Sequence, residues 1–78
     1  MTLTVISSYD TLFSGEADSV TLPGVKGSFT VLKNHAPLIS VLVAGKVVYK
    51  TESGEARELD IKGGLADVAE NVISVCVY

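Results

Sequence analysis

The feature that most constrains the fold of this chain is an apolar alternation with a period of two residues, repeated along almost its whole length. Side chains of an extended strand point to opposite faces in turn, so this period is typical of strands with one buried face. No segment convincingly shows the spacing of an amphipathic helix. The pattern therefore predicts an all-β protein. The alternating sets are Leu3 and Val5; Phe29 and Val31; Val47 and Tyr49; Leu59 and Ile61; and Ile73, Val75 and Val77.

Turn-forming residues interrupt the alternation at intervals of about eight to twelve residues, a spacing typical of β-sandwiches and barrels. The interruptions delimit about nine short strands. One of them, Leu22-Pro23-Gly24-Val25, has the proline and glycine of a type II turn. No repeat or linker divides residues 1–78, so we predict a single domain. The interruptions fall at Ser14-Gly15, Pro23-Gly24, Gly27, Asn34-His35-Ala36-Pro37, Gly45, Ser53-Gly54, Gly63-Gly64 and Glu70-Asn71.

The composition excludes several classes of protein. A chain of 78 residues holds one small core of marginal stability, which makes a partner plausible. Its 47% hydrophobic residues exclude a disordered tail, and its single cysteine excludes a disulfide scaffold. The six basic residues are dispersed and the formal net charge is −3, so we expect no nucleic acid partner. No signal-like N-terminus or apolar run of about 18 residues occurs, so we expect no direct membrane insertion and favour the cytoplasm.

The residues of nucleophilic and zinc sites are sparse. His35 and Cys76 are the only histidine and the only cysteine. A nucleophilic site needs a third, orienting group, and a zinc site needs three or four nitrogen or sulfur ligands. Cys76 lies in an apolar strand, where burial would raise the pKa of a thiol and make it unreactive. We therefore predict no catalytic residues and no metal site.

Paired carboxylates and glycine loops are equally weak signals. Carboxylates two residues apart share a strand face, but solvated strand edges explain them better than paired catalytic acids. The glycine loops lack P-loop spacing and precede no helix, so we predict no bound cofactor. These features are Glu16 with Asp18, Glu58 with Asp60, Gly24-Val25-Lys26-Gly27, and Lys62-Gly63-Gly64.

Three segments are apolar in both phases of the alternation, which an isolated sandwich does not require. We expect one outward face of the sheet to meet a partner. The alternative, central strands with scattered exposed valines, stays open. So does the question of which phase faces outward. The segments are Leu38, Ile39, Val41, Leu42 and Val43; Val47, Val48 and Tyr49; and Val75, Cys76, Val77 and Tyr78.

A longer motif covers Leu22–Leu38: Leu-Pro-Gly-Val-Lys-Gly-Ser-Phe, a short gap, and then His-Ala-Pro-Leu. This motif resembles the ε subunit of F-type ATP synthases. Phe13–Ala17 is similar to the Phe-x-Gly-Glu-Ala that precedes it in that family. Gly63–Val68 and Asn71-Val72 are similar to its Gly-Gly-Phe-x-x-Val and Asn-x-Val ending. The resemblance covers the whole chain in order, with Leu65 where the family often has Phe.

The resemblance implies the N-terminal domain of an ε subunit, a β-sandwich of two antiparallel sheets with about nine to ten short strands. It also implies a non-catalytic rotor subunit of the central stalk, which couples the γ subunit to the c-ring during ion-driven ATP synthesis. Such a subunit lies at the cytoplasmic face of the bacterial inner membrane, peripherally, through its complex. The three segments that are apolar in both phases would then be explained by an outer face of the sheet that packs on γ.

The resemblance also assigns residues to partners. The alternative to a c-ring contact at Lys26, Gly27 and Ser28 is an ordinary exposed turn. The alternative to a γ contact at His35 is a hydrogen bond that closes its own irregular loop. The assigned residues are Lys26, Gly27 and Ser28 in the c-ring loop, and His35, Ala36, Leu38, Ile39 and Val41 on the γ side.

Two other functions stay open. One is a free-standing β-sandwich that binds a small ligand, and the other is an enzyme built on His35 and Cys76. No helical periodicity occurs up to Tyr78, so the sequence predicts a short form that lacks the family's C-terminal helical domain. That form would couple rotation without inhibition by helix extension and without an ATP site.

Overall fold

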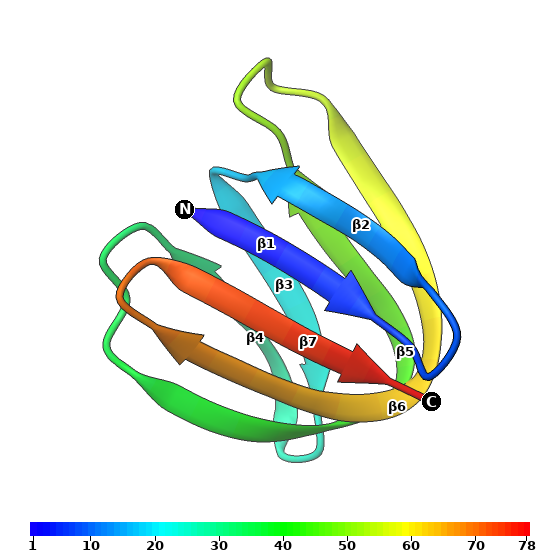
Figure 1. Cartoon of the computed structure of the whole chain (residues 1–78). Coiled ribbons are helices and arrows are strands. Elements are labelled where there is room, and N and C mark those ends of the chain that lie inside the picture. Colours follow the sequence, from blue (N-terminus) through cyan, green and yellow to red (C-terminus); the bar gives the residue numbers. More distant parts are fainter.

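The computed structural model describes residues 1–78 and consists of seven strands. Figure 1 shows β1, β2 and β7 lying in front of β3, β4 and β5, so the strands form two layers. The predicted all-β sandwich is confirmed. No helix in the structure is long and apolar enough to cross a bilayer. The strands are β1 (Thr2–Ile6), β2 (Thr11–Glu16), β3 (Ser19–Gly24), β4 (Gly27–Leu32), β5 (Leu38–Lys50), β6 (Ala56–Ala69) and β7 (Val72–Val77).

All seven strands belong to one hydrogen-bonded sheet, in the order β2-β1-β7-β6-β5-β3-β4. Neighbouring strands are antiparallel, except that β1 and β7 are parallel. The two sheets expected from the resemblance are thus two layers of one sheet, because the long strands β5 and β6 curve from one layer into the other (Figure 1).

The length of β5 and β6 explains why there are seven strands rather than nine or ten. These strands contain 13 and 14 residues, and the interruptions predicted at Gly45 and Gly63-Gly64 lie inside them. The buried phase of β5 changes along the strand, from even-numbered Leu42 to odd-numbered Val47. The β5–β6 ribbon therefore exchanges its inward and outward faces between the layers. The glycines mark this corner and not a chain reversal.

The β3–β4 hairpin turns two residues later than the sequence predicted. Gly24 lies opposite Gly27 in the register, so Val25-Lys26 forms the tip. Gly27 has the positive φ, 126°, that a type II turn would have placed at Gly24. Pro23 remains inside β3, at the point where the register with β5 shifts. The missing N–H of a proline is tolerated at such an irregularity.

Sixteen buried apolar residues fill the space between the layers, and no polar or charged residue is buried. Leu3, Val20 and Ile73, from three different strands, are fully buried. The rings of Phe13 and Tyr49 pack with centroids 4.4 Å apart, joining β2 to β5 across the layers. Since only apolar side chains occupy the interior, the polar chemistry of this domain lies on its surface.

Candidate partner-binding surface

The first half of β5 exposes apolar side chains on its outer face. Ile39 and Val41 are 70% and 53% exposed, and Val43 is 43% exposed. The intervening Leu42 is buried, and Leu38 packs against the core. In this half of β5 the odd-numbered side chains therefore point outward. Of the residues assigned to the γ side, Ile39 and Val41 lie on this outer face, whereas Leu38 points inward.

The exposed apolar side chains continue from β5 across three more strands. Val41 lies opposite Leu65 of β6, and Leu65 lies opposite Cys76 of β7. Cys76 lies opposite Ile6 of β1. All four side chains are exposed. Because directly paired residues hold their Cβ atoms about 5 Å apart, these four form a continuous strip, here called the apolar row.

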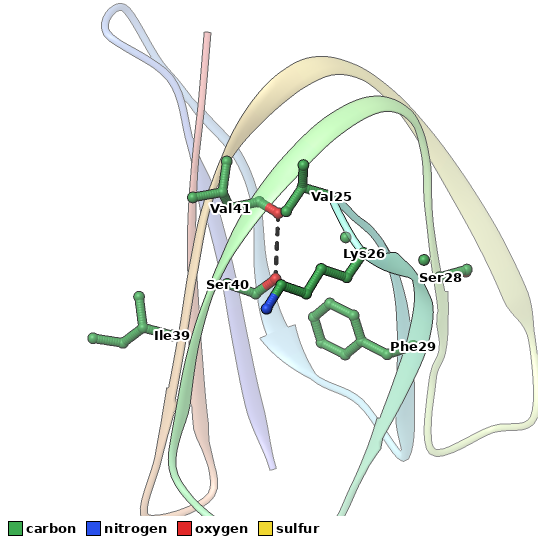
Figure 2. A pocket seen from close by; sticks show the side chains of 9 residues that line it. Val25, Lys26, Ser28, Phe29, Ile39, Ser40 and Val41 are labelled. Atoms are coloured by element: carbon green, nitrogen blue, oxygen red, sulfur yellow. Dashed lines mark hydrogen bonds between the residues drawn. The ribbon is translucent and has the colours of Figure 1, made fainter.

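Further apolar side chains flank the apolar row. Val25 donates its N–H to the carbonyl oxygen of Val41 at 2.9 Å, so the hairpin tip lies beside the row. Figure 2 shows Val25 next to Val41, and its dashed line is the separate bond from the Ser40 hydroxyl to the same carbonyl oxygen. Tyr78 donates its N–H to the carbonyl oxygen of Gly63 at 3.2 Å, which holds Tyr78 beside the corner. Contiguous exposed apolar surface is typical of interaction sites. We call the apolar row together with Val25, Ile39, Val43 and Tyr78 the apolar face.

Sequence reasoning missed Ile6, Leu65 and Cys76 as members of one surface. The expected burial of Cys76 is wrong, because alternate residues of β7 point outward and Cys76 is one of them. The doubly apolar segment Val75–Tyr78 was the one signal that pointed toward this part of it. Whether these residues are neighbours depends on the register between paired strands, and the alternation of apolar residues does not encode that register. For Ile6 it also depends on the pairing of β1 with β7, which are distant in sequence.

A hollow of about 520 Å³ lies between the β3–β4 hairpin and the start of β5. Figure 2 shows the side chain of Lys26 extending across it toward Ser40. Lys26 takes part in no ion pair. The hollow shares three residues with the apolar face, so the two surfaces are contiguous. Its lining includes Lys26, Gly27 and Ser28 of the predicted c-ring loop, and Val25, Ile39 and Val41 of the apolar face.

The β4–β5 loop, which contains His35 and Ala36, is separate from this hollow. His35 is half-buried, and its Nδ1 lies 2.7 Å from the carbonyl oxygen of Ala36. This is the local hydrogen bond that the sequence left as the alternative to a partner contact, and Ala36 is exposed. Strand β4 separates the loop from the hairpin by roughly 20 Å of extended chain. The structure therefore does not bring His35 to Lys26 or Ser28.

The first pair of closely spaced carboxylates makes surface contacts. The Oε2 of Glu16 accepts a hydrogen bond from the hydroxyl of Thr2 at 2.8 Å. The Oδ1 of Asp18 lies 3.5 Å from the Nζ of Lys33. No group of three or more His, Cys, Asp or Glu side chains gathers as a metal-binding site would require.

A two-layer sheet with an apolar core and a contiguous apolar outer face indicates a protein-interaction domain. The chain belongs to the family described as the β-sandwich domain of the ATP synthase delta/epsilon chain, whose model matches residues 1–78. The resemblance to the ε subunit is thus confirmed, and with it the class of a non-catalytic ATP synthase subunit.

Curated relatives are ATP synthase epsilon chains. The protein of Caulobacter vibrioides is 45% identical over 64 residues, which are 82% of this chain and 73% of that one. The protein of Leptospira borgpetersenii is 37% identical over 76 residues, covering 96% and 58% of the two chains. In Rhodopseudomonas palustris the match covers 52% of the relative. The chain thus spans between about half and three quarters of the length of these relatives.

Two solved structures share the fold. A chain in the Euglena gracilis mitochondrial ATP synthase, solved with OSCP, F1 and the c-ring, gives a TM-score of 0.89 at 23% identity. The match covers 96% of this chain and 48% of that one. A chain in the central stalk and c-ring structure of the Tetrahymena thermophila mitochondrial ATP synthase gives 0.80 at 15% identity, covering 97% and 61%.

Proposed function

We propose that this chain is a non-catalytic rotor module of an F-type ATP synthase that couples the γ subunit to the c-ring during ion-driven ATP synthesis. The observation that carries the proposal is the apolar row, which four paired strands build across one outer face. Family membership supports it, as does the origin of the Tetrahymena relative in a central stalk and c-ring structure.

The apolar face has the chemistry of the centre of a protein interface, where apolar residues are enriched and charges are depleted. If docking on γ removes roughly 50 Å² of apolar surface from water at each residue of the apolar row, burial contributes about 1.2 kcal/mol per residue. Four residues then favour binding by about 5 kcal/mol before the entropic cost of association. In this assignment Ile39 and Val41 contact γ directly, His35 and Ala36 extend the contact, and Leu38 supports it from the core.

The β3–β4 hairpin suits a second, weaker contact with the c-ring. Lys26 offers an exposed cation and Ser28 an exposed hydroxyl. Exposed contacts of this kind contribute about 0.2–1 kcal/mol each. Since the hairpin and the apolar face adjoin, one rigid sheet meets both neighbours and transmits rotation between them. The domain is then peripheral, at the cytoplasmic face of the membrane, and held there by its complex.

Cys76 provides a probe for this proposal, because it is the only cysteine and is exposed within the apolar row. A maleimide labels Cys76 in the free chain, and we expect bound γ to slow this labelling at least tenfold. The matched control carries Cys76→Ser with Glu58→Cys. Its thiol lies on the other half of the β5–β6 ribbon, where the Glu58 side chain is 58% exposed, and it should label at the same rate with and without γ.

Each result of this experiment decides between functions. Co-elution with γ together with protection of Cys76 supports the proposal. Co-elution without protection moves the interface to another face. A chain that does not co-elute with γ, and whose melting temperature rises with a small molecule, is the free-standing ligand-binding sandwich instead.

A further inference from the structure

Three segments that are distant in sequence meet at Asn71, in the turn between β6 and β7. The Oδ1 of Asn71 accepts the backbone N–H of Asn34 at 2.6 Å, and its Nδ2 donates to the Oδ1 of Asn34 at 3.0 Å. Its carbonyl oxygen accepts the N–H of Thr2 at 2.9 Å. Asn71 therefore joins the β4–β5 loop and the start of β1 to the β6–β7 turn.

The backbone conformation of both asparagines suits this pairing. Asn34 and Asn71 have φ values of 63° and 62°, in the left-handed region that asparagine adopts more readily than most other residues. The pairing uses both ends of the Asn71 amide, one as acceptor and one as donor. A side chain that lacks either end loses half of the contact.

Asn34 and Asn71 are exposed, but two hydrogen bonds join them, whereas the other contacts of the β4–β5 loop are local or a single long ion pair. His35 donates its N–H to the carbonyl oxygen of Leu32 at 3.2 Å, and its ring bonds to Ala36. The ion pair of Lys33 with Asp18 spans 3.5 Å between side chains that are 58% and 44% exposed, so it constrains the loop little. The contact with Asn71 is thus the principal link that fixes this loop relative to the layer containing β7.

The position of the loop bears directly on the apolar face. Ile39 follows Pro37 by two residues, and Ile39 is the first exposed residue of that face along β5. A loop that is free to move presents His35 and Ala36 in many arrangements beside Ile39. A loop held in one arrangement binds more tightly, because apparent affinity scales with the fraction of molecules in the competent conformation.

We propose that Asn71 is a positioning residue for partner binding, which holds His35 and Ala36 in the arrangement that the partner meets beside the apolar face. The inference rests on the proposed function, since the partner is γ. Asn71 itself makes no contact with γ in this proposal. Its effect passes through Asn34 and the loop.

The test uses Asn71→Gly, which keeps the left-handed backbone and the carbonyl oxygen that Thr2 binds, and removes only the amide. We expect affinity for γ, measured by calorimetry, to fall roughly three- to tenfold, as the loop populates competing conformations.

Asn71→Asp keeps the acceptor and loses the donor, so its affinity should lie between those of Asn71→Gly and the unmodified chain. The matched control is Glu70→Gly in the same turn, where the side chain makes no hydrogen bond to the loop and affinity should not change.

A second background separates positioning from a general loss of stability. In a chain carrying His35→Gly and Ala36→Gly, the loop presents neither of these side chains to γ, so adding Asn71→Gly should change affinity less than twofold. An equal loss in both backgrounds would overturn the positioning role, and so would unchanged affinity of Asn71→Gly. If the unmodified chain itself does not bind γ, the proposed function fails and this inference fails with it.

Discussion

The two halves of the β5–β6 ribbon share one antiparallel register and expose opposite chemistry. In the apolar half, Leu38–Val43 pairs with Gly63–Val68, and its outer face presents residues such as Val41 and Leu65. In the charged half, Lys46–Lys50 pairs with Ala56–Asp60, and Lys46 lies opposite Asp60. The pairing of β5 with β6 is regular in both halves. The difference between them therefore lies in side chains and not in backbone.

The neighbours of each half explain the difference. In the apolar half, β7 pairs with Gly64–Ala69, so β6 has no free edge there. In the charged half, Ala56–Asp60 pairs only with β5 and leaves a free edge, where charged residues prevent pairing with another chain. The charges of the charged half thus protect a free edge. The exposed apolar side chains lie where the backbone of β6 is hydrogen-bonded on both sides and needs no such protection. In the proposed function, contact with γ is the reason that these side chains are apolar.

The corner between the two halves is the place where a single change should have the largest effect. A Cβ atom on Gly64 would overlap the carbonyl oxygen of Cys76 and approach the Cα of Val77, and these are backbone atoms that cannot rotate away. We expect Gly64→Ala to lower the free energy of unfolding by about 3 kcal/mol, measured by urea denaturation. Gly54→Ala, at a φ of 85° with open space around it, should lose only about 1 kcal/mol. Equal losses would mean that the corner is not tightly packed.

The sequence predicted the all-β fold because period-two alternation survives in most strands, but it did not predict the corner. The buried phase shifts between Leu42 and Val47, and in a single sequence such a shift with a nearby glycine is indistinguishable from a turn. Only the continuous pairing with β6 shows that the ribbon goes on. The parallel pairing of β1 with β7 joins the two ends of the chain and had no local signal either.

The candidate surface was predictable in part for a related reason. Ile39 and Val41 were visible because their segment is apolar in both phases. Leu38 was assigned to the same surface by the family resemblance, and the sequence alone offers no reference that shows which phase of the alternation points inward. Leu65 and Ile6 join the surface through cross-strand pairing, which the sequence does not display.

The second prediction places a charge in the apolar row, which should weaken partner binding without unfolding the domain. Val41→Lys should leave the melting temperature nearly unchanged, since Val41 is 53% exposed. It should weaken γ binding at least tenfold, because an unpaired ammonium in an interface costs several kcal/mol of binding free energy. Leu32→Lys, at a site 57% exposed on β4, is the matched control and should bind γ normally.

A refinement of this test uses Ile39, which lies opposite Asp67. A lysine placed at position 39 has a carboxylate within reach, so Ile39→Lys should weaken γ binding less than Val41→Lys does. Titration calorimetry with both variants gives the comparison. Normal binding by both, in folded protein, would remove the apolar half from the interface.

The third prediction concerns the hairpin hollow beside the apolar half. Lys26→Glu should reduce assembly with the c-ring about two- to fivefold, as expected for one exposed charge contact. The reduction should be larger at low salt, because ions screen exposed charges. Lys50→Glu, a charge reversal in the charged half, is the control and should have no effect. A disulfide or maleimide crosslink from Ser28→Cys to the ring that never exceeds background would contradict this contact.

The smallest effect is expected in the charged half itself. The Nζ of Lys46 lies 3.3 Å from the Oε1 of Glu58, and the two side chains are 56% and 58% exposed. Water and salt screen such a pair, so Lys46→Ala should lower the free energy of unfolding by no more than about 0.5 kcal/mol. Because the proposed function places these charges outside the contact with γ, the same change should leave γ affinity unaltered. Urea denaturation and calorimetry on one preparation measure both quantities. If Lys46→Ala instead weakens γ binding threefold or more while stability stays constant, the charged half belongs to the interface, and exposed apolar chemistry is not what selects the docking face.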